Sequence, residues 1–250
     1  MPRPRHAPHS CFPPSRGIRA PVRMPARAPL AMALCLGLQA GTARGDCIED
    51  APDHVTCSDV VPSYLVDGDT QLTVDILQNT SFNGPFEIDN VDVVSVSNGT
   101  STAPGGNLQS VVMDNTPNAV FLNNGNINGT FTITGGGNHF LLNYLVGGRF
   151  NGPIVLEGDG NNTIYNYGTL NPTVQVNGTG VTVVQNLSTS GGEATMNGGV
   201  VVNGAGPVQI TNSGRIQNGS ITTRSAGDFI PNFGRHMQVG AALCNCLGFG

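Results

Sequence analysis

Short runs of apolar and β-branched residues, separated by Asn and Gly, fill the chain from about residue 60 to residue 234. Each run has three to seven residues, which is a strand length, and several alternate apolar with polar side chains. No stretch here repeats its apolar residues with the 3.6 period of a helix. The pattern therefore predicts an all-β fold. Examples are Val91–Ser97, Phe131–Thr134, Pro153–Leu156, Val174–Val176, Val181–Val184 and Val200–Val202.

Asparagine recurs after or beside these runs at steps of 23, 20, 26 and 20 residues. The residues that define these steps are Asn143, Asn166, Asn186, Asn212 and Asn232. Three of them begin an Asn-x-Gly unit, which ends at Gly168, Gly214 or Gly234. A period between 20 and 50 residues is the signature of an architecture built from stacked units.

We predict a right-handed parallel β-helix, a solenoid of roughly eight coils over residues 60–234. In such a fold, inward apolar side chains stack on those of the next coil, about 4.8 Å away. Corner Asn side chains bond to their copies in neighbouring coils, and Gly permits the sharp turns. An antiparallel sandwich of Asn-Gly hairpins is the alternative. A sandwich, however, has no reason to repeat an Asn-x-Gly unit at this interval.

The N-terminal part has the order of a secretory signal. Arg23–Arg27 supply positive charge, Pro29–Leu38 form an apolar core, and small residues at Gly41 and Ala43 precede the expected cleavage site. The apolar run is too short to cross a membrane, which takes about 20 residues. We therefore predict a signal peptide at 24–43, cleaved after Ala43. Residues 1–23 are rich in Pro and Arg, and are either a disordered extension or sequence upstream of a true start at Met24.

Export places the cysteines in an oxidising compartment. We predict a disulfide between Cys47 and Cys57 in an N-terminal cap spanning 44–59, with two free thiols as the alternative. In the entropy model a loop of this size stabilises the fold by roughly 3 kcal/mol. Residues 235–250 have no strand pattern and are predicted to be an irregular tail. The role of Cys244 and Cys246 within that tail stays open.

The charges are few and unevenly placed. The formal net charge is −5, the chain has no Lys, and none of its 16 acidic residues precedes Asp46. From Gly45 onward, four Arg stand against sixteen acidic residues, which gives a net charge of −12. Because a surface this acidic repels phosphate backbones, we expect no nucleic-acid partner.

Two segments resemble the passenger domains of β-helical autotransporters. Cys47-Ile-Glu-Asp-Ala-Pro-Asp-His-Val-Thr-Cys57-Ser resembles the opening of such passengers after their signal, and Asn212–Ile221 resembles their repeat. The likeness spans about residues 24–234. It implies type V secretion through an outer-membrane barrel of a Gram-negative cell, followed by exposure at the cell surface or release.

The resemblance covers the passenger only. A translocation barrel has strands of about 10 residues with alternating apolar character and aromatic girdles, and no such strands follow residue 235. The barrel is the partner that the resemblance implies, and we interpret the sequence as truncated or frame-shifted relative to the family pattern.

Candidate catalytic chemistry is sparse. Gly-x-Ser-x-Gly does not occur, the five His are scattered, and we interpret His139 as a coil-corner residue rather than a base. Leu156–Ile164 has the Gly-x-Gly rhythm of a calcium nonapeptide, but Asn replaces the usual Asp and the unit does not recur. We therefore expect no catalytic residues, no cofactor and no metal.

The sequence favours a non-enzymatic scaffold for adhesion or aggregation, with bacterial or host surface glycans or proteins as candidate partners. A polysaccharide-active β-helix enzyme is the alternative, and it would need an acidic cluster plus a base on one face. The only Arg available for that role are Arg149, Arg215, Arg224 and Arg235. A non-functional gene fragment is the third interpretation.

The mature chain is predicted to begin near Arg44, because the small residues Gly41 and Ala43 follow the apolar run directly. Mass spectrometry of exported protein should show this terminus. Exported protein that retains Met1 or Met24 would contradict the signal assignment.

Overall fold

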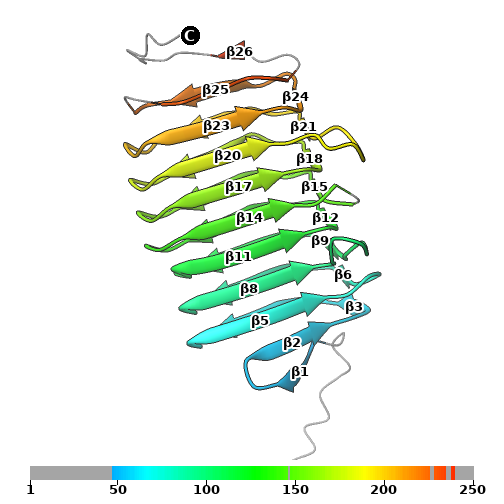
Figure 1. Ribbon diagram of the computed structural model, residues 1–250. Helices are drawn as coiled ribbons and strands as arrows, with labels where there is room; N and C mark the ends of the chain where they lie inside the picture. Colours follow the sequence, from blue (N-terminus) through cyan, green and yellow to red (C-terminus); the bar gives the residue numbers. More distant parts are fainter. Residues whose placement is uncertain (1–46, 146, 226–227, 235–237, 240–250) are drawn as a thin grey trace, which may run out of the picture. The chain divides into compact units, whose positions relative to one another are not determined.

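The computed structural model describes residues 47–145, 147–225, 228–234 and 238–239. The predicted extension at 1–23, the signal peptide at 24–43, its cleavage site at Ala43 and most of the tail lie outside these residues. The described residues contain no helix and form three parallel sheets that stack as a β-solenoid of eight coils (Figure 1). In particular, no helix that could cross a bilayer is found among them. The predicted fold class is confirmed.

Each coil contributes one strand to each sheet. Sheet A contains β1 (Cys47–Ala51), β2 (His54–Cys57), β5 (Gln71–Ile76), β8 (Val93–Asn98), β11 (Asn118–Asn123), β14 (His139–Asn143), β17 (Asn162–Asn166), β20 (Thr182–Asn186) and β23 (Val208–Asn212). Sheet B contains β3 (Val60–Val61), β6 (Ser81–Phe82), β9 (Asn107–Leu108), β12 (Asn126–Ile127), β15 (Arg149–Phe150), β18 (Thr169–Leu170), β21 (Thr195–Met196) and β24 (Arg215–Ile216). Sheet C contains β4 (Tyr64–Asp67), β7 (Pro85–Asp89), β10 (Ser110–Asp114), β13 (Phe131–Thr134), β16 (Ile154–Glu157), β19 (Val174–Asn177), β22 (Val200–Val202), β25 (Ser220–Thr223) and β26 (Gln238–Val239).

The coil is right-handed. In Figure 1 the strands of sheet A cross the front from left to right while successive coils rise from the N-terminal to the C-terminal end. All strand pairs are parallel except β1 with β2. Right-handed crossovers are the near-universal solution for parallel strands, because they suit the twist of the strands.

The ends of the solenoid differ from the predicted boundaries of 60 and 234. Strand β2 already pairs in parallel with β5, so the first coil starts at His54 and the cap is shorter than expected. At the other end, Gln238 and Val239 lie in the tail predicted as irregular, yet they form β26 and pair with β25. The open backbone edge of β25 supplies the hydrogen-bonding partners that make even two residues a strand.

The core is the narrow space between the three sheets. Alternate residues of each strand point into it, as the burial pattern of β14 and β17 illustrates. Aromatic rings fill the N-terminal half. Phe121 packs edge-on against Phe131, with ring centroids 4.8 Å apart, and Phe131 packs edge-on against Phe150. In the C-terminal half the same columns are filled mainly by Ile and Val, without a change of register.

A continuous ladder of asparagines runs along the end of sheet A, buried from Asn98 to Asn212 and ending at the exposed Asn232. Each side-chain amide donates a hydrogen bond to the amide oxygen one coil further on, over 2.7–2.9 Å. The second N–H of most members donates to a backbone carbonyl of the following turn, such as Gly168 for Asn166. We call this set the inner ladder: Asn98, Asn123, Asn143, Asn166, Asn186, Asn212 and Asn232.

The predicted ladder residues are therefore in place, but the reason for their glycines is different. Positive φ does not occur at Gly168, Gly214 or Gly234. Instead, a Cβ at Gly168 would lie 2.3 Å from the carbonyl oxygen of Gly148, and one at Gly214 equally close to that of Ala194. These glycines let neighbouring coils approach at the corner.

Nearly all variation in coil length falls at one corner, between sheets A and B. From sheet C to sheet A the spacing of core residues is constant, for example eight residues from Ile133 to Leu141 and from Leu156 to Ile164. From the inner ladder to the core residue of sheet B it is four residues after Asn166 but ten after Asn186. The unequal steps of the sequence repeat are thus loops added at this corner, while the stack itself stays regular.

The substitution Asn166→Asp should destabilise the fold by about 3–5 kcal/mol, because it buries a carboxylate that has no donor for Asn186 or Gly168. The matched control is Asn171→Asp. Asn171 bonds to Asn151 and Asn197 in a second, more exposed ladder. The control should cost about 1 kcal/mol or less. Urea unfolding followed by far-UV circular dichroism compares the two, and equal losses would show that burial of the inner ladder is unimportant.

Candidate functional site

The residues singled out by the sequence are structural in this fold. Cys47 and Cys57 lie opposite each other in the β1–β2 pair and form a disulfide with an S–S distance of 2.06 Å. In Leu156–Ile164, the segment with the Gly-x-Gly rhythm, Glu157 accepts a hydrogen bond from Asn177 and Asp159 accepts one from Thr179. Among the described residues, no group of three or more His, Cys, Asp or Glu is placed to hold a metal ion.

His139 is not the coil-corner residue that the sequence suggested. It begins β14, is 1% exposed, and points into the core, where Asn162 Oδ1 lies 3.0 Å from its Nδ1. Its Nε2 is buried without a hydrogen-bond partner. Burial lowers the pKa of His139 below the usual 6.5, against the opposing effect of Asn162. The corner prediction failed because Gly135–Gly137 end the turn one residue before the strand starts.

The three outer faces of the solenoid differ in charge. Five carboxylates point outward from sheet C, whereas the exposed Arg149 and Arg215 belong to sheet B. Asp67, Asp89 and Asp114 stack at one position of three successive coils. Burial raises the pKa of Asp89, and the charges of Asp114 and Asp67 raise it further. The outward carboxylates of sheet C are Asp67, Glu87, Asp89, Asp114 and Glu157.

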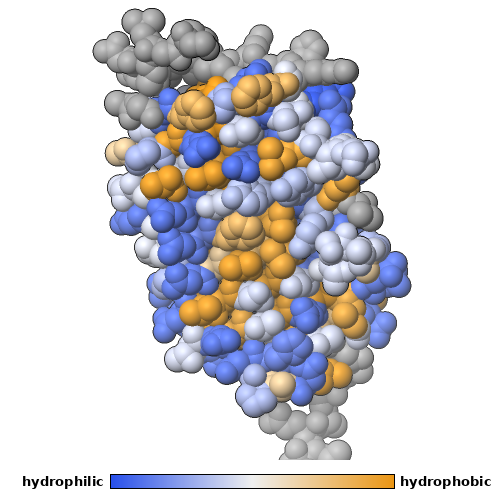
Figure 2. All heavy atoms as spheres, viewed as in Figure 1, coloured by the Kyte–Doolittle hydropathy of each residue, from blue (hydrophilic) through white to orange (hydrophobic). Residues whose placement is uncertain are grey.

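Sheet A carries no charged side chain on its outer face from β8 to β23. Figure 2 shows hydrophobic residues gathered along the middle of this face, with polar residues beside them. Phe140 and Tyr165 pack edge-on in adjacent coils, with ring centroids 5.5 Å apart. We call this surface the apolar face. Its outward residues are Ser95, Ser97, Val120, Leu122, Phe140, Leu142, Thr163, Tyr165, Val183, Gln185, Gln209 and Thr211.

Two long corner loops border this face. They follow β14 and β20, and Leu145 of the first lies against Gly191 and Gly192 of the second. The second loop is closed by a pair of backbone hydrogen bonds between Thr189 and Gly192. The two loops therefore contact each other although they belong to coils two apart. Both protrude at the corner between sheets A and B in Figure 1.

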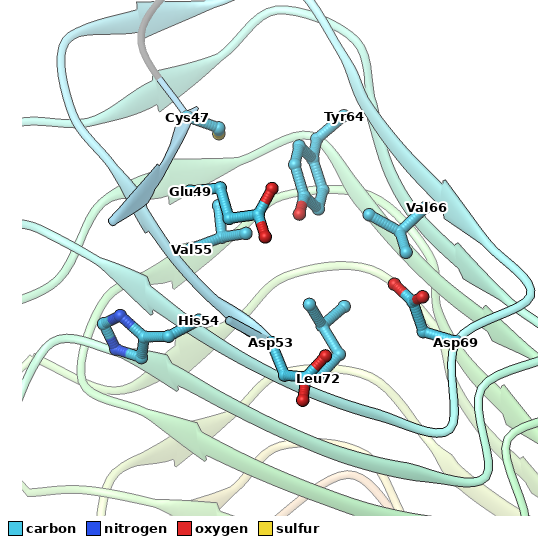
Figure 3. Close-up of a pocket in the computed structure, with 9 residues that line it drawn as sticks. All are labelled: Cys47, Glu49, Asp53, His54, Val55, Tyr64, Val66, Asp69 and Leu72. Atoms are coloured by element: carbon cyan, nitrogen blue, oxygen red, sulfur yellow. The ribbon is translucent and has the colours of Figure 1, made fainter. Parts of the chain in front are cut away.

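The N-terminal end of the solenoid contains a hollow of about 340 Å³ (Figure 3). Val55, Val66 and Leu72 form its apolar floor, while the carboxylates of Glu49, Asp53 and Asp69 lie around it. Tyr64 completes the wall. Its lining residues are Cys47, Glu49, Asp53, His54, Val55, Tyr64, Val66, Asp69 and Leu72.

His54 lines the hollow but directs its imidazole away from the centre, as Figure 3 shows. Its Nδ1 bonds to Asp50, and its Nε2 lies 3.2 Å from Asp75. These bonds raise the pKa of His54, the one to Asp50 most strongly. The bonds from His54 and Thr56 lower the pKa of Asp50. His54 therefore ties the cap strand to the second coil, and its proton is engaged there.

Comparison with protein-family models, with curated proteins and with solved structures finds no match to this chain. The resemblance to autotransporter passengers therefore stays a prediction from sequence.

Sequence reasoning missed the apolar face and the hollow. The apolar face depends on which outward residues of successive coils lie side by side. The hollow depends on which residues meet at the N-terminal end of the stack. That information comes from the register of the strands. The uninterrupted apolar run Phe140–Leu142 was the available signal, but it did not say that Thr163–Tyr165 lies beside it.

The two described histidines should give opposite pH dependence. The depressed pKa of His139 means that the unfolded chain takes up a proton near pH 6.5 that the folded chain does not, so stability falls as pH drops below 6.5. For His54, whose pKa is raised, the stabilisation is present below 6.5 and is lost as pH rises through its folded pKa. Compared with the wild type, His139→Asn should therefore remove acid sensitivity, and His54→Gln should increase it.

Urea unfolding between pH 5 and 8 checks both variants. Asn is chosen at position 139 because Asn162 occupies the same column in the next coil. Identical pH slopes for both variants and the wild type would contradict the assignment.

Proposed function

We propose that this protein is an exported scaffold of the autotransporter-passenger type, non-enzymatic, that promotes adhesion by aggregation at the cell surface. Its apolar face is the contact surface, and a second copy of the chain is the partner. The observation that carries the proposal is the outer surface of sheet A, which is uncharged from β8 to β23 and carries apolar side chains, whereas the outer face of sheet C is acidic and that of sheet B carries Arg149 and Arg215.

Charge selects the partner. Two copies of a chain with a net charge of −12 from residue 45 onward repel each other overall. Contact through sheet C would place the Asp67–Asp89–Asp114 column close to a second acidic surface. The apolar face avoids this repulsion, and an antiparallel arrangement about a twofold axis brings the same residues of both copies together.

The size of the face indicates how strong the contact can be. Six strands at 4.8 Å spacing and five residues per strand give about 24 Å by 17 Å, or roughly 400 Å² per copy. The pair would bury about 800 Å², below the roughly 1,200 Å² of stable interfaces. One contact is therefore weak, and aggregation depends on many copies presented on one surface.

Beads coated with the full chain should clump, and Leu142→Asp on the apolar face should reduce clumping roughly tenfold, because the charge would be buried in the contact. The matched control is Val155→Asp on the outer face of sheet C, which should clump like the wild type. Added salt should strengthen clumping, because it screens the repulsion between the acidic bodies.

Two results would overturn the proposal. Equal loss in both variants would mean that the apolar face is not the contact. Clumping that weakens with salt would indicate an electrostatic contact instead. Binding of wild-type beads to host cells or glycans without clumping would redirect the proposal to a different partner.

A polysaccharide-active enzyme is the alternative. Among the described residues, the only ion pairs are those of His54 with Asp50 and Asp75, so no Arg stands beside the acidic column of sheet C. Release of reducing or unsaturated sugar ends from a panel of polyuronates would favour this alternative over the scaffold.

A further inference from the structure

The geometry points to the N-terminal hollow as a binding site for an organic cation, a guanidinium or alkylammonium group on a short apolar stem. The inference does not depend on the proposed function, because the hollow lies at the end of the solenoid and shares no residue with the apolar face. It rests on four features of the hollow: a buried hydroxyl without a partner, the placement of the carboxylates, an aromatic ring at the end of a stack, and an apolar floor.

The hydroxyl of Tyr64 is buried and has no hydrogen-bond partner in the structure. Buried hydroxyls without a partner are uncommon in folded proteins, and a ligand atom in the hollow would explain this one. Burial raises the pKa of Tyr64 to about 12, and the charges of Asp69 and Glu49 act in the same direction. The hydroxyl therefore stays neutral, and its oxygen can accept a hydrogen bond from an N–H group of the ligand.

The carboxylates select a positive ligand. Glu49, Asp53 and Asp69 come from three different segments, and Figure 3 shows them on separate sides of the hollow. None of these three takes part in an ion pair in the described structure. Because they surround a space rather than converge on one point, they suit an extended planar or tetrahedral cation with several N–H donors better than a bare metal ion.

The ring of Tyr64 adds a second cation-binding element. One face of the ring stacks on Phe86 of the next coil, with centroids 5.2 Å apart and an angle of 15°. Strand β4 is the end strand of sheet C, so no described coil stacks on the other face. A cation above an aromatic face is attracted by the ring quadrupole.

The apolar base of the hollow is the reason for proposing an apolar stem on the ligand. Val55 and Leu72 are core residues of the first two coils, and with Val66 they give the hollow an apolar base. A methylene chain can lie there while its charged end reaches the carboxylates, as Lys and Arg side chains do. The volume of about 340 Å³ is at the lower end for small-molecule sites and holds one such group.

The cation can come from two sources. One is an external amine or guanidine compound, free or carried by a partner. The other is Arg44 of the chain itself, which stands three residues before Cys47 and is the predicted first residue of the mature chain. The chemistry recognised by the hollow is the same in both cases.

The test uses butylguanidinium as the probe and butylurea as its neutral isostere, titrated into the full ¹⁵N-labelled chain. Butylguanidinium should give saturable shifts in the amide signals of Tyr64, Val66 and Leu72, while butylurea should give none. The double variant Glu49→Gln with Asp69→Asn should bind roughly tenfold more weakly, and Tyr64→Phe several-fold more weakly. Asp92→Asn, an exposed carboxylate outside the hollow, controls for net charge and should bind like the wild type.

Arg44→Gln distinguishes the sources. If the wild type does not respond but Arg44→Gln does, the chain's own guanidinium occupies the hollow. If both respond alike, the ligand is external. The inference is overturned if neither protein gives saturable shifts, or if the double variant binds as well as the wild type while circular dichroism shows that it is folded.

Discussion

The hydrogen bond from each inner-ladder amide to the next is the interaction on which the stack depends. A primary amide in a dry interior has two N–H donors and one oxygen that need hydrogen-bonding partners. Its own coil supplies only some of these partners. The remaining partner is the same amide one coil further on. A slip by one residue would turn every ladder side chain outward and reverse the alternation of the whole strand. The ladder therefore fixes the register of seven neighbouring segments from Asn98 to Asn232.

The ladder does not reach the first two coils, and these are held differently. Its column continues there as Ile76 and Cys57, which pair with each other and then with Asn98. Cys57 is bonded to Cys47, and His54 joins the cap strand to Asp75 in the second coil. At the N-terminal end, a disulfide and an ion pair thus take the place of the hydrogen bonds between ladder side chains. This replacement leaves the hollow between β1 and β4, because a cap that runs antiparallel does not extend the parallel stack over sheet C.

The strands and most of the asparagine ladder can be predicted from short stretches of sequence, but the composition of the outer faces cannot. Strands and the Asn166–Asn232 steps are visible because each is a property of a few adjacent residues. Asn98 and Asn123 were missed, although their steps of 25 and 20 residues match the later ones and Asn123 also begins an Asn-x-Gly unit. His139 was misplaced because adjacent glycines resemble a turn whether the next residue points in or out. The apolar face combines residues about 20 to 25 positions apart, so only the register of the strands could reveal it.

The concentration of nearly all length variation at one corner has an evolutionary consequence. The corner from sheet C to sheet A keeps a fixed number of residues between core positions, and the corner from sheet B to sheet C varies only from three residues, as between Leu108 and Val111, to five, as between Ile216 and Ile221. The corner after the inner ladder is different, since the hydrogen bonds from Asn143 and Asn186 to the ladder amides of the next coil are made whatever the length of the loop that follows. Loops at this position can lengthen, shorten or exchange without a change in the fold. A lineage of such proteins can therefore diversify what it displays beside the apolar face while the folding information stays the same.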